Sequence, residues 1–171
     1  MTEILEFHLE SKIRPTDPSI LCDCGPPRAL YKVNPRLILG KEWWDKRRKQ
    51  AYHEFCSMCA ACGISYVELQ AHELYDINKK TGKVKLKDVV PLCKDCHSFV
   101  HQDLHRALLA KGELKTADVV RILKHGKRIL RQAGICCKRN DPNDSNIEFN
   151  QWRLVIGENE YSPIFGNNAR G

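Results

Sequence analysis

Two CxxC motifs, separated by thirty residues, constrain the fold of this chain more than any other feature. Cys59 and Cys62 form the first motif, and Cys93 and Cys96 form the second. A turn with this spacing presents two thiolates to one ion, and two such turns complete the tetrahedral four-thiolate site that is typical of structural Zn²⁺. The sequence therefore predicts a structural zinc ion that joins two distant segments.

The other cysteines leave alternatives open. The chain holds nine cysteines, an odd number that cannot all pair as disulfides, and a reducing compartment favours metal binding over disulfides. Cys56 stands three residues before Cys59, so these two could form the first pair, although Gly63 favours the later pair because a knuckle usually needs a small residue at its turn. A second zinc site could be built from Cys22, Cys24, Cys136 and Cys137, but their spacings are less diagnostic than CxxC. We therefore favour the interpretation that these four residues are small buried thiols.

Length and charge set broader limits. With 171 residues the chain has room for one domain and its appendages. A net charge of +7 and a pI near 9.0 favour a polyanionic partner, although a basic chain also suits a membrane surface. The sequence has no run of about 18 apolar residues and begins with an acidic segment that lacks a signal-peptide core. We therefore expect an intracellular, cytoplasmic protein that makes no contact with membranes.

Residue patterns predict a mixture of helices and strands. An uninterrupted segment with helical periodicity predicts a helix over 41–55 that has a basic side. Strand-forming residues, turn residues and alternation predict a β-hairpin with strands over 66–74 and 83–90. Two more helices are expected: one that the second CxxC motif opens after Pro91 and that runs to about Ala110, and one over 116–133.

The predicted elements give an α+β fold in four segments. The first, 1–40, is an extension with a short strand and a Pro-rich stretch, and the second, 41–112, is the core with its lead-in helix. The third, 113–135, is a basic amphipathic helix, and the fourth, 136–171, contains a linker, a strand over 147–156 and a loose tail.

Histidines next to the second CxxC motif suggest another metal site. His97, His101 and His105 recur at steps of four, so we expect all three imidazoles to share one face of the predicted helix. His72 is near the end of the first hairpin strand, and the hairpin could fold it over the start of this helix. We expect His72, His97 and His101 to surround a metal ion, with positions left for water and a phosphate oxygen, and His105 to lie outside the site.

The order of these motifs resembles the HNH endonucleases, a family of ββα-metal nucleases. The shared features are CxxCG, a strand with His-Glu, a hairpin, LCxxCH and a histidine four residues later. They cover 59–101, about a quarter of the chain, and the upstream helix with Trp43, Arg47 and Tyr52 is also similar to the lead-in of many members. The resemblance implies a zinc-stapled ββα-metal core with flanking helices and short strands.

The same resemblance implies an activity and its residues. The four CxxC cysteines would hold the structural Zn²⁺, while His97 and His101 would bind a catalytic ion such as Mg²⁺ or Mn²⁺. The implied reaction is metal-dependent hydrolysis of phosphodiester bonds in DNA, in double-stranded form. Asp88 stands where the family has its middle asparagine, and an aspartate can accept hydrogen bonds there but lacks the amide donor.

The role of His72 stays open between two alternatives. It occupies the first signature position, where family members commonly place a ligand and then a base, but here the local sequence is Ala71-His72-Glu73. If His72 is the general base, the preceding ligand is missing; if His72 is a ligand, Glu73 stands where the base usually lies. An unperturbed imidazole pKa near 6.5 favours His72 as the base.

Basic residues outside the core are candidates for phosphate contacts. They lie on two predicted helices and comprise Arg47, Arg48, Arg121, Lys124, Arg128 and Arg131. Two rival interpretations remain: a catalytically silent zinc module that binds nucleic acid, and a zinc-stapled adaptor that binds proteins. The three histidines argue against the adaptor, which would need only the cysteines.

Overall fold

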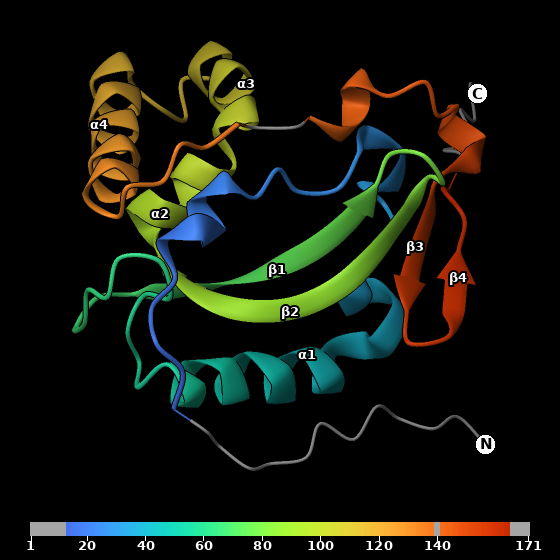
Figure 1. The fold of residues 1–171 in the computed structure, drawn as a ribbon, viewed down its shortest axis with the longest axis horizontal. Helices are drawn as coiled ribbons and strands as arrows, with labels where there is room; N and C mark the ends of the chain where they lie inside the picture. The colour runs from blue at the N-terminus through green and yellow to red at the C-terminus, as the bar shows by residue number, and fades with distance from the viewer. Residues whose placement is uncertain (1–12, 139–140, 165–171) are drawn as a thin grey trace.

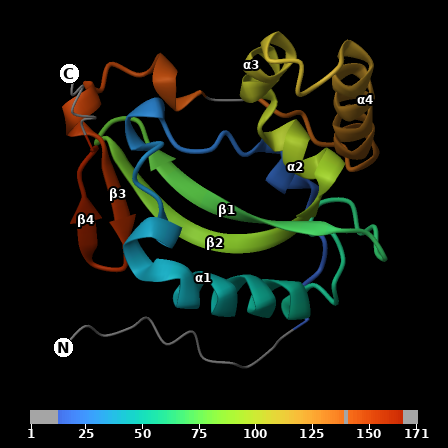
Figure 2. The same cartoon turned by 180° about the vertical axis from the view of Figure 1, so that it is seen from behind.

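The computed structural model describes residues 13–138 and 141–164 and shows a mixed α+β fold. Its sheet has four strands in the order β1-β2-β3-β4, and helix α1 lies on one side of the β1–β2 hairpin (Figure 1). Helices α2, α3 and α4 lie on the other side, as the view from behind also shows (Figure 2). The α+β class is therefore confirmed. No described helix is both long and apolar enough to cross a membrane.

The long hairpin is the centre of the fold. Strand β1 (Leu69–Asn78) pairs with the antiparallel strand β2 (Lys83–Cys93), with a bulge after Leu74. Asn78 starts the turn, since its side chain accepts hydrogen bonds from two backbone amides, and Gly82 takes a φ of 70°. The predicted hairpin is confirmed, but β1 begins three residues later and ends four residues later than expected, and β2 extends to Cys93 and so runs directly into the second CxxC motif.

Helix α1 (Pro35–Glu54) covers one face of the hairpin. Asn34 caps the helix through Leu37 N, and Gly40 interrupts it with a φ of 84°. Beyond Gly40 the helix follows the prediction over 41–55, and Trp44 and Ala51 are buried against Val89 of β2. This packing fixes the position of the hairpin, because the buried side chains come from both elements.

The helical region after β2 differs from the prediction. In place of one helix to Ala110, α2 (Lys94–Val100) ends at His101, and the 3-10 helix η3 (Gln102–Leu104) and α3 (His105–Ala110) follow. His101 has a ψ of 29° and so leaves the α-helical path. The expected face shared by three histidines therefore does not form.

Helix α4 (Thr116–Gln132) agrees with the prediction over 116–133 and packs on α2. The two helices approach closely at Gly126, where an added Cβ would lie 2.2 Å from the ring of Phe99. The 3-10 helix η1 (Pro18–Cys22) packs into the same core through Ile20 and Leu21. Segments before and after the hairpin thus hold α2 against the sheet.

The C-terminal segment adds two short strands to the sheet. Strand β3 (Arg153–Ile156) runs parallel to β2, and β4 (Asn159–Tyr161) is antiparallel to β3. The predicted strand over 147–156 is thus only its last four residues, because the 3-10 helix η5 (Phe149–Gln151) precedes it. The strand expected near the amino terminus falls within 1–12, outside the described residues.

Candidate metal centres

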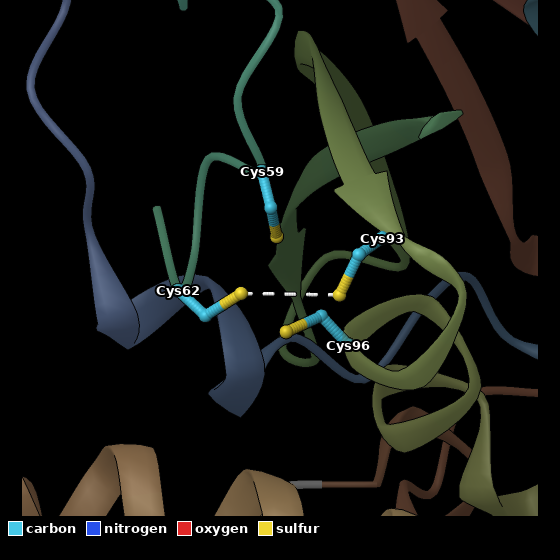
Figure 3. A group of neighbouring side chains, drawn as sticks. All are labelled: Cys59, Cys62, Cys93 and Cys96. Carbon is cyan, nitrogen blue, oxygen red and sulfur yellow. Dashed lines mark hydrogen bonds between the residues drawn. The ribbon is translucent and has the colours of Figure 1, made fainter. Parts of the chain in front are cut away.

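The four CxxC cysteines converge on one point (Figure 3). Two come from the loop after α1, one from the end of β2 and one from α2, and their sulfur atoms all lie within 4.8 Å of one another. Cys62 Sγ and Cys93 Sγ are 3.8 Å apart. Thiolates at about 2.3 Å from a tetrahedral centre would be about 3.8 Å apart, so the spacing suits Zn²⁺. The arrangement is compatible with a structural zinc site.

Backbone hydrogen bonds shape the first knuckle. Cys59 N donates to Ile64 O over 2.9 Å, and Gly63 N donates to Cys59 O over 2.9 Å. Gly63 has a φ of 73°, which explains why a glycine follows Cys62. Ala60 N donates to Pro91 O over 2.7 Å and so ties the knuckle to β2. The loop therefore reaches the end of β2 through its own backbone as well as through the cluster.

Because the four sulfur atoms lie close together, the pKa values of their thiols shift in different directions. Hydrogen bonds from the other cysteines, first from Cys62, lower the pKa of Cys59. The pKa of Cys96 is raised, first by its hydrogen bond to Cys59, because thiolates cannot accumulate side by side without a cation. A divalent cation would remove this penalty, since it binds cysteine as thiolate.

The remaining cysteines do not join this group. Cys56 is exposed and lies outside it, so the later pair, Cys59 and Cys62, is the one that converges with the second motif. Among the described residues, no metal-binding group includes Cys22, Cys24, Cys136 or Cys137. The expectation of buried thiols holds only in part, because Cys22, Cys24 and Cys137 are half-buried whereas Cys136 is exposed.

His72, His97 and His101 form a second cluster. One ligand nitrogen from each lies within 4.8 Å of the others, and the ring centroids are 4.7 to 5.4 Å apart. His72 comes from β1, His97 from α2, and His101 from the residue where α2 ends. His97 directly follows Cys96, so α2 contributes to both clusters. The structure therefore brings together the three histidines that the sequence predicts as neighbours.

Two polar side chains hold the imidazoles. His72 Nε2 is 3.0 Å from Asp23 Oδ2, and His97 Nδ1 is 2.7 Å from Gln70 Oε1. Burial, and then the charge of His72, lowers the pKa of His97 to about 4, so this ring is neutral near pH 7. A neutral imidazole keeps a lone pair, which metal binding requires.

A cavity of about 590 Å³ opens beside the histidine cluster. Its lining includes His72 and His101, Glu73 from β1, Arg36 from α1, and Leu104 from η3. The lining residues come from elements on both sides of the sheet, so the cavity extends around the outer strand β1. The histidine cluster is thus next to an open space, in which a ligand could reach it.

His105 lies away from the cluster, as expected. It is buried, and its Nε2 is 2.9 Å from Ser98 O. Glu73 lies next to His72 on β1, where neighbouring side chains point to opposite faces, and it is outside the ligand group but lines the same cavity.

Asp88 and Arg47 belong to a network of charges that packs α1 against β2. Arg47 is only 5% exposed and pairs with Asp88 and Glu54, while Arg14 pairs with the same two carboxylates. Asp88 also accepts a hydrogen bond from Val89 N. The expectation that Arg47 contacts phosphate is therefore corrected, since its guanidinium is buried in this network. Asp88 is bound by two arginines there.

The remaining basic candidates differ in their surroundings. Arg48 pairs with Asp45 at 2.8 Å on α1. On α4 the side chains of Arg121, Lys124 and Arg128 line one hollow of about 430 Å³, where Arg121 also pairs with Asp95. Arg131 lines a neighbouring hollow with Lys127. The α4 residues are exposed and form a basic face.

Three contacts were missed by the sequence analysis. Asp23 and Gln70 hold His72 and His97, and His125 of α4 places Nε2 at 3.4 Å from Cys96 Sγ. No motif surrounds these residues, and each contact joins positions at least 27 residues apart. Only the tertiary fold could reveal them.

Comparisons with protein-family models, with curated proteins and with solved structures found no match to this chain.

Proposed function

We propose that this chain is a metal-dependent endonuclease of the HNH type that hydrolyses phosphodiester bonds in DNA. The observation that carries the proposal is the convergence of His72, His97 and His101, with ligand nitrogens within 4.8 Å of one another beside an open cavity. They lie on a β-hairpin followed by a helix, the order of elements that the HNH resemblance implies. The zinc site formed by the four cysteines would hold this unit together.

The proposal assigns His72 as an ion ligand together with His97 and His101. A base that acts through water would lie one water molecule further from the ion, whereas the ligand nitrogen of His72 lies within 4.8 Å of those of His97 and His101, which favours His72 as a ligand. Glu73, which lines the same cavity, is then the candidate to take the proton of the attacking water. An ion held by the histidines would neutralise charge on the phosphate and on the departing oxygen.

The donor set bears on which ion is bound. Three imidazoles suit Zn²⁺, Ni²⁺ or Fe²⁺ better than Mg²⁺, which prefers oxygen ligands. We therefore expect a transition ion to support activity at lower concentration than Mg²⁺. Double-stranded DNA is the proposed partner, with the exposed basic residues of α4 as candidate phosphate contacts.

A plasmid assay tests this function. Zinc-loaded protein, which here means protein with one Zn²⁺ per chain and dialysed free of other ions, is incubated with plasmid and with Mg²⁺, Mn²⁺ or Ni²⁺ in turn. Cleavage should require the added ion and should be lost in His97→Ala, while His53→Ala, a change at an exposed histidine of α1, should cleave at the native rate. Absence of cleavage with every ion, or native cleavage by His97→Ala, would refute the proposal.

A second candidate is the catalytically silent module that binds nucleic acid. The observation in its favour is Asp88, which occupies the middle signature position but is bound by Arg14 and Arg47. This candidate predicts salt-dependent DNA binding in a gel-shift assay without cleavage under any ion condition. The plasmid and gel-shift assays together therefore distinguish the two.

A further inference from the structure

Asp23 is a largely buried carboxylate that no sequence motif marks. It directly follows η1, and its backbone N–H donates to Ile20 O over 3.1 Å. Its side chain is 12% exposed and meets that of His72, which is 3% exposed, across 49 positions of the chain. The core packing of η1 holds Asp23 at this place, because Ile20 and Leu21 on the same short helix are buried.

The contacts of Asp23 distinguish it from a fourth ion ligand. The ligand atoms of His72, His97 and His101 all lie within 4.8 Å of one another, and no carboxylate oxygen of the described residues belongs to that group. Asp23 Oδ2 lies 3.0 Å from Nε2 of His72. It is therefore placed as a hydrogen-bonding partner of that ligand.

The chemistry of the pair decides which nitrogen of His72 faces an ion. An ionised carboxylate can only accept hydrogen bonds, so a neutral His72 that donates to Asp23 would carry its proton on Nε2 and keep the lone pair on Nδ1. Gln70 favours the other tautomer at His97. Its amide oxygen can only accept and lies 2.7 Å from Nδ1, so a neutral His97 would carry its proton on Nδ1 and keep the lone pair on Nε2. Partners of this kind fix the tautomer and the ring orientation of metal-binding histidines.

We propose that Asp23 is a positioning residue that holds His72 in the tautomer with Nδ1 unprotonated and so preorganises the three-histidine site for its ion. This inference rests on the proposed function only in assigning His72 as a ligand, and it deepens that assignment. Removal of such a partner typically lowers metal affinity by roughly 10- to 100-fold. If the Asp23–His72 pair served folding alone, ion affinity would not depend on which nitrogen of His72 carries the proton.

Nitrogen NMR on the wild-type protein tests the tautomer directly. In zinc-loaded protein labelled with ¹⁵N at histidine and free of a second ion, His72 should show a protonated Nε2 and an unprotonated Nδ1 near pH 7. His97 should show the reverse. A His72 ring protonated at Nδ1, or at both nitrogens, would overturn the proposal, and this measurement needs no variant to fold.

Calorimetric titration of zinc-loaded protein with Ni²⁺ tests the consequence. Asp23→Ala should lower the affinity by roughly 10- to 100-fold. Asp23→Asn should lower it less, because the amide oxygen still accepts from Nε2. The matched control is Asp76→Asn, at an exposed position on the same strand as His72, and it should bind Ni²⁺ like the wild type.

The outcomes separate this inference from the nuclease proposal. A folded Asp23→Ala protein that binds Ni²⁺ with native affinity would overturn the role of Asp23, whatever the plasmid assay shows. Native tautomers with the expected losses of affinity would support it even if no DNA is cleaved, in which case only the nuclease proposal fails.

Discussion

The cysteine cluster and the histidine cluster share helix α2 but have opposite environments. Cys96 and His97 are adjacent, yet they belong to different clusters. Cys96 is one of four thiols that are mostly buried, whereas His97 is one of three imidazoles beside a cavity of about 590 Å³. Structural zinc sites are closed by four protein ligands, whereas catalytic ions keep a position open. The cysteine cluster is therefore compatible with a closed structural site, whereas the histidine cluster lies beside an open space.

The largest expected effect comes from breaking the cysteine cluster. Cys93→Ser should lose the zinc ion and unfold the hairpin and α2, because binding of a structural zinc ion is itself folding free energy, on the order of 10 kcal/mol in small zinc domains. Metal analysis and thermal unfolding measure this. Cys56→Ser, at an exposed cysteine outside the cluster, should keep both the zinc ion and the stability. Retention of zinc by Cys93→Ser would break the comparison.

A change in the charge network should lower stability without touching either cluster. Asp88→Asn removes the charge that Arg14 and Arg47 share, and the loss of one partner from a mostly buried ion pair costs about 3 kcal/mol. Urea unfolding should show this loss, while Ni²⁺ affinity of the remaining folded protein stays native. A Ni²⁺ affinity that falls tenfold would instead place Asp88 within the histidine site.

The two clusters also differ in how much of each the sequence could predict. The cysteine site follows from local spacing, because each CxxC turn preforms half of it. Prediction of the histidine site required the hairpin as well, because only the hairpin brings His72 close to the start of α2. Its supports, Asp23 and Gln70, depend on tertiary packing of η1 and β1 against α2, which no local pattern encodes.

Errors in the predicted elements have similar causes. The helix expected to Ala110 breaks at His101, although neither proline nor glycine marks the break. The two residues before the break, Phe99 and Val100, are buried in the main core, so α2 ends at a tertiary contact rather than at a helix-breaking residue. Likewise, Arg47 looked like a surface cation on a basic helix, but the carboxylates that neutralise it are Asp88 of β2 and Glu54, which lies about two turns further along α1.

Acidification should lower the free energy of unfolding in a defined pH window, through His97. The folded pKa of His97 is lowered to about 4, whereas the unfolded value is near 6.5, so the unfolded chain binds more protons between these values. The contribution to stability is complete above pH 6.5 and falls as the pH approaches 4, with a loss of about 2 kcal/mol between pH 7 and pH 5.

Urea unfolding of zinc-loaded protein without a second ion measures this loss. Because zinc release by the cysteines also depends on pH, the informative quantity is the difference between wild type and His97→Gln, which lacks the titrating ring. Equal pH dependence of the two proteins would show that His97 is not held neutral by the fold.

The smallest effect is expected at the contact between α4 and the cysteine cluster. His125→Ala removes a hydrogen-bonding partner at 3.4 Å from Cys96 Sγ, and such a contact contributes about 1 kcal/mol. Competition with a chromophoric chelator should reveal a loss in zinc affinity of about tenfold or less, with Ni²⁺ binding at the histidines unchanged. A larger change at the histidines than at the cysteines would contradict the division between the clusters.

One titration tests most directly the claim that the chain holds a closed structural site and a separate open site. Zinc-loaded wild-type protein should bind one further Ni²⁺ per chain, and His97→Ala should lose this second ion while it keeps its zinc and its thermal midpoint. The claim would be contradicted if the zinc-loaded protein bound no second ion, or if His97→Ala lost its zinc as well.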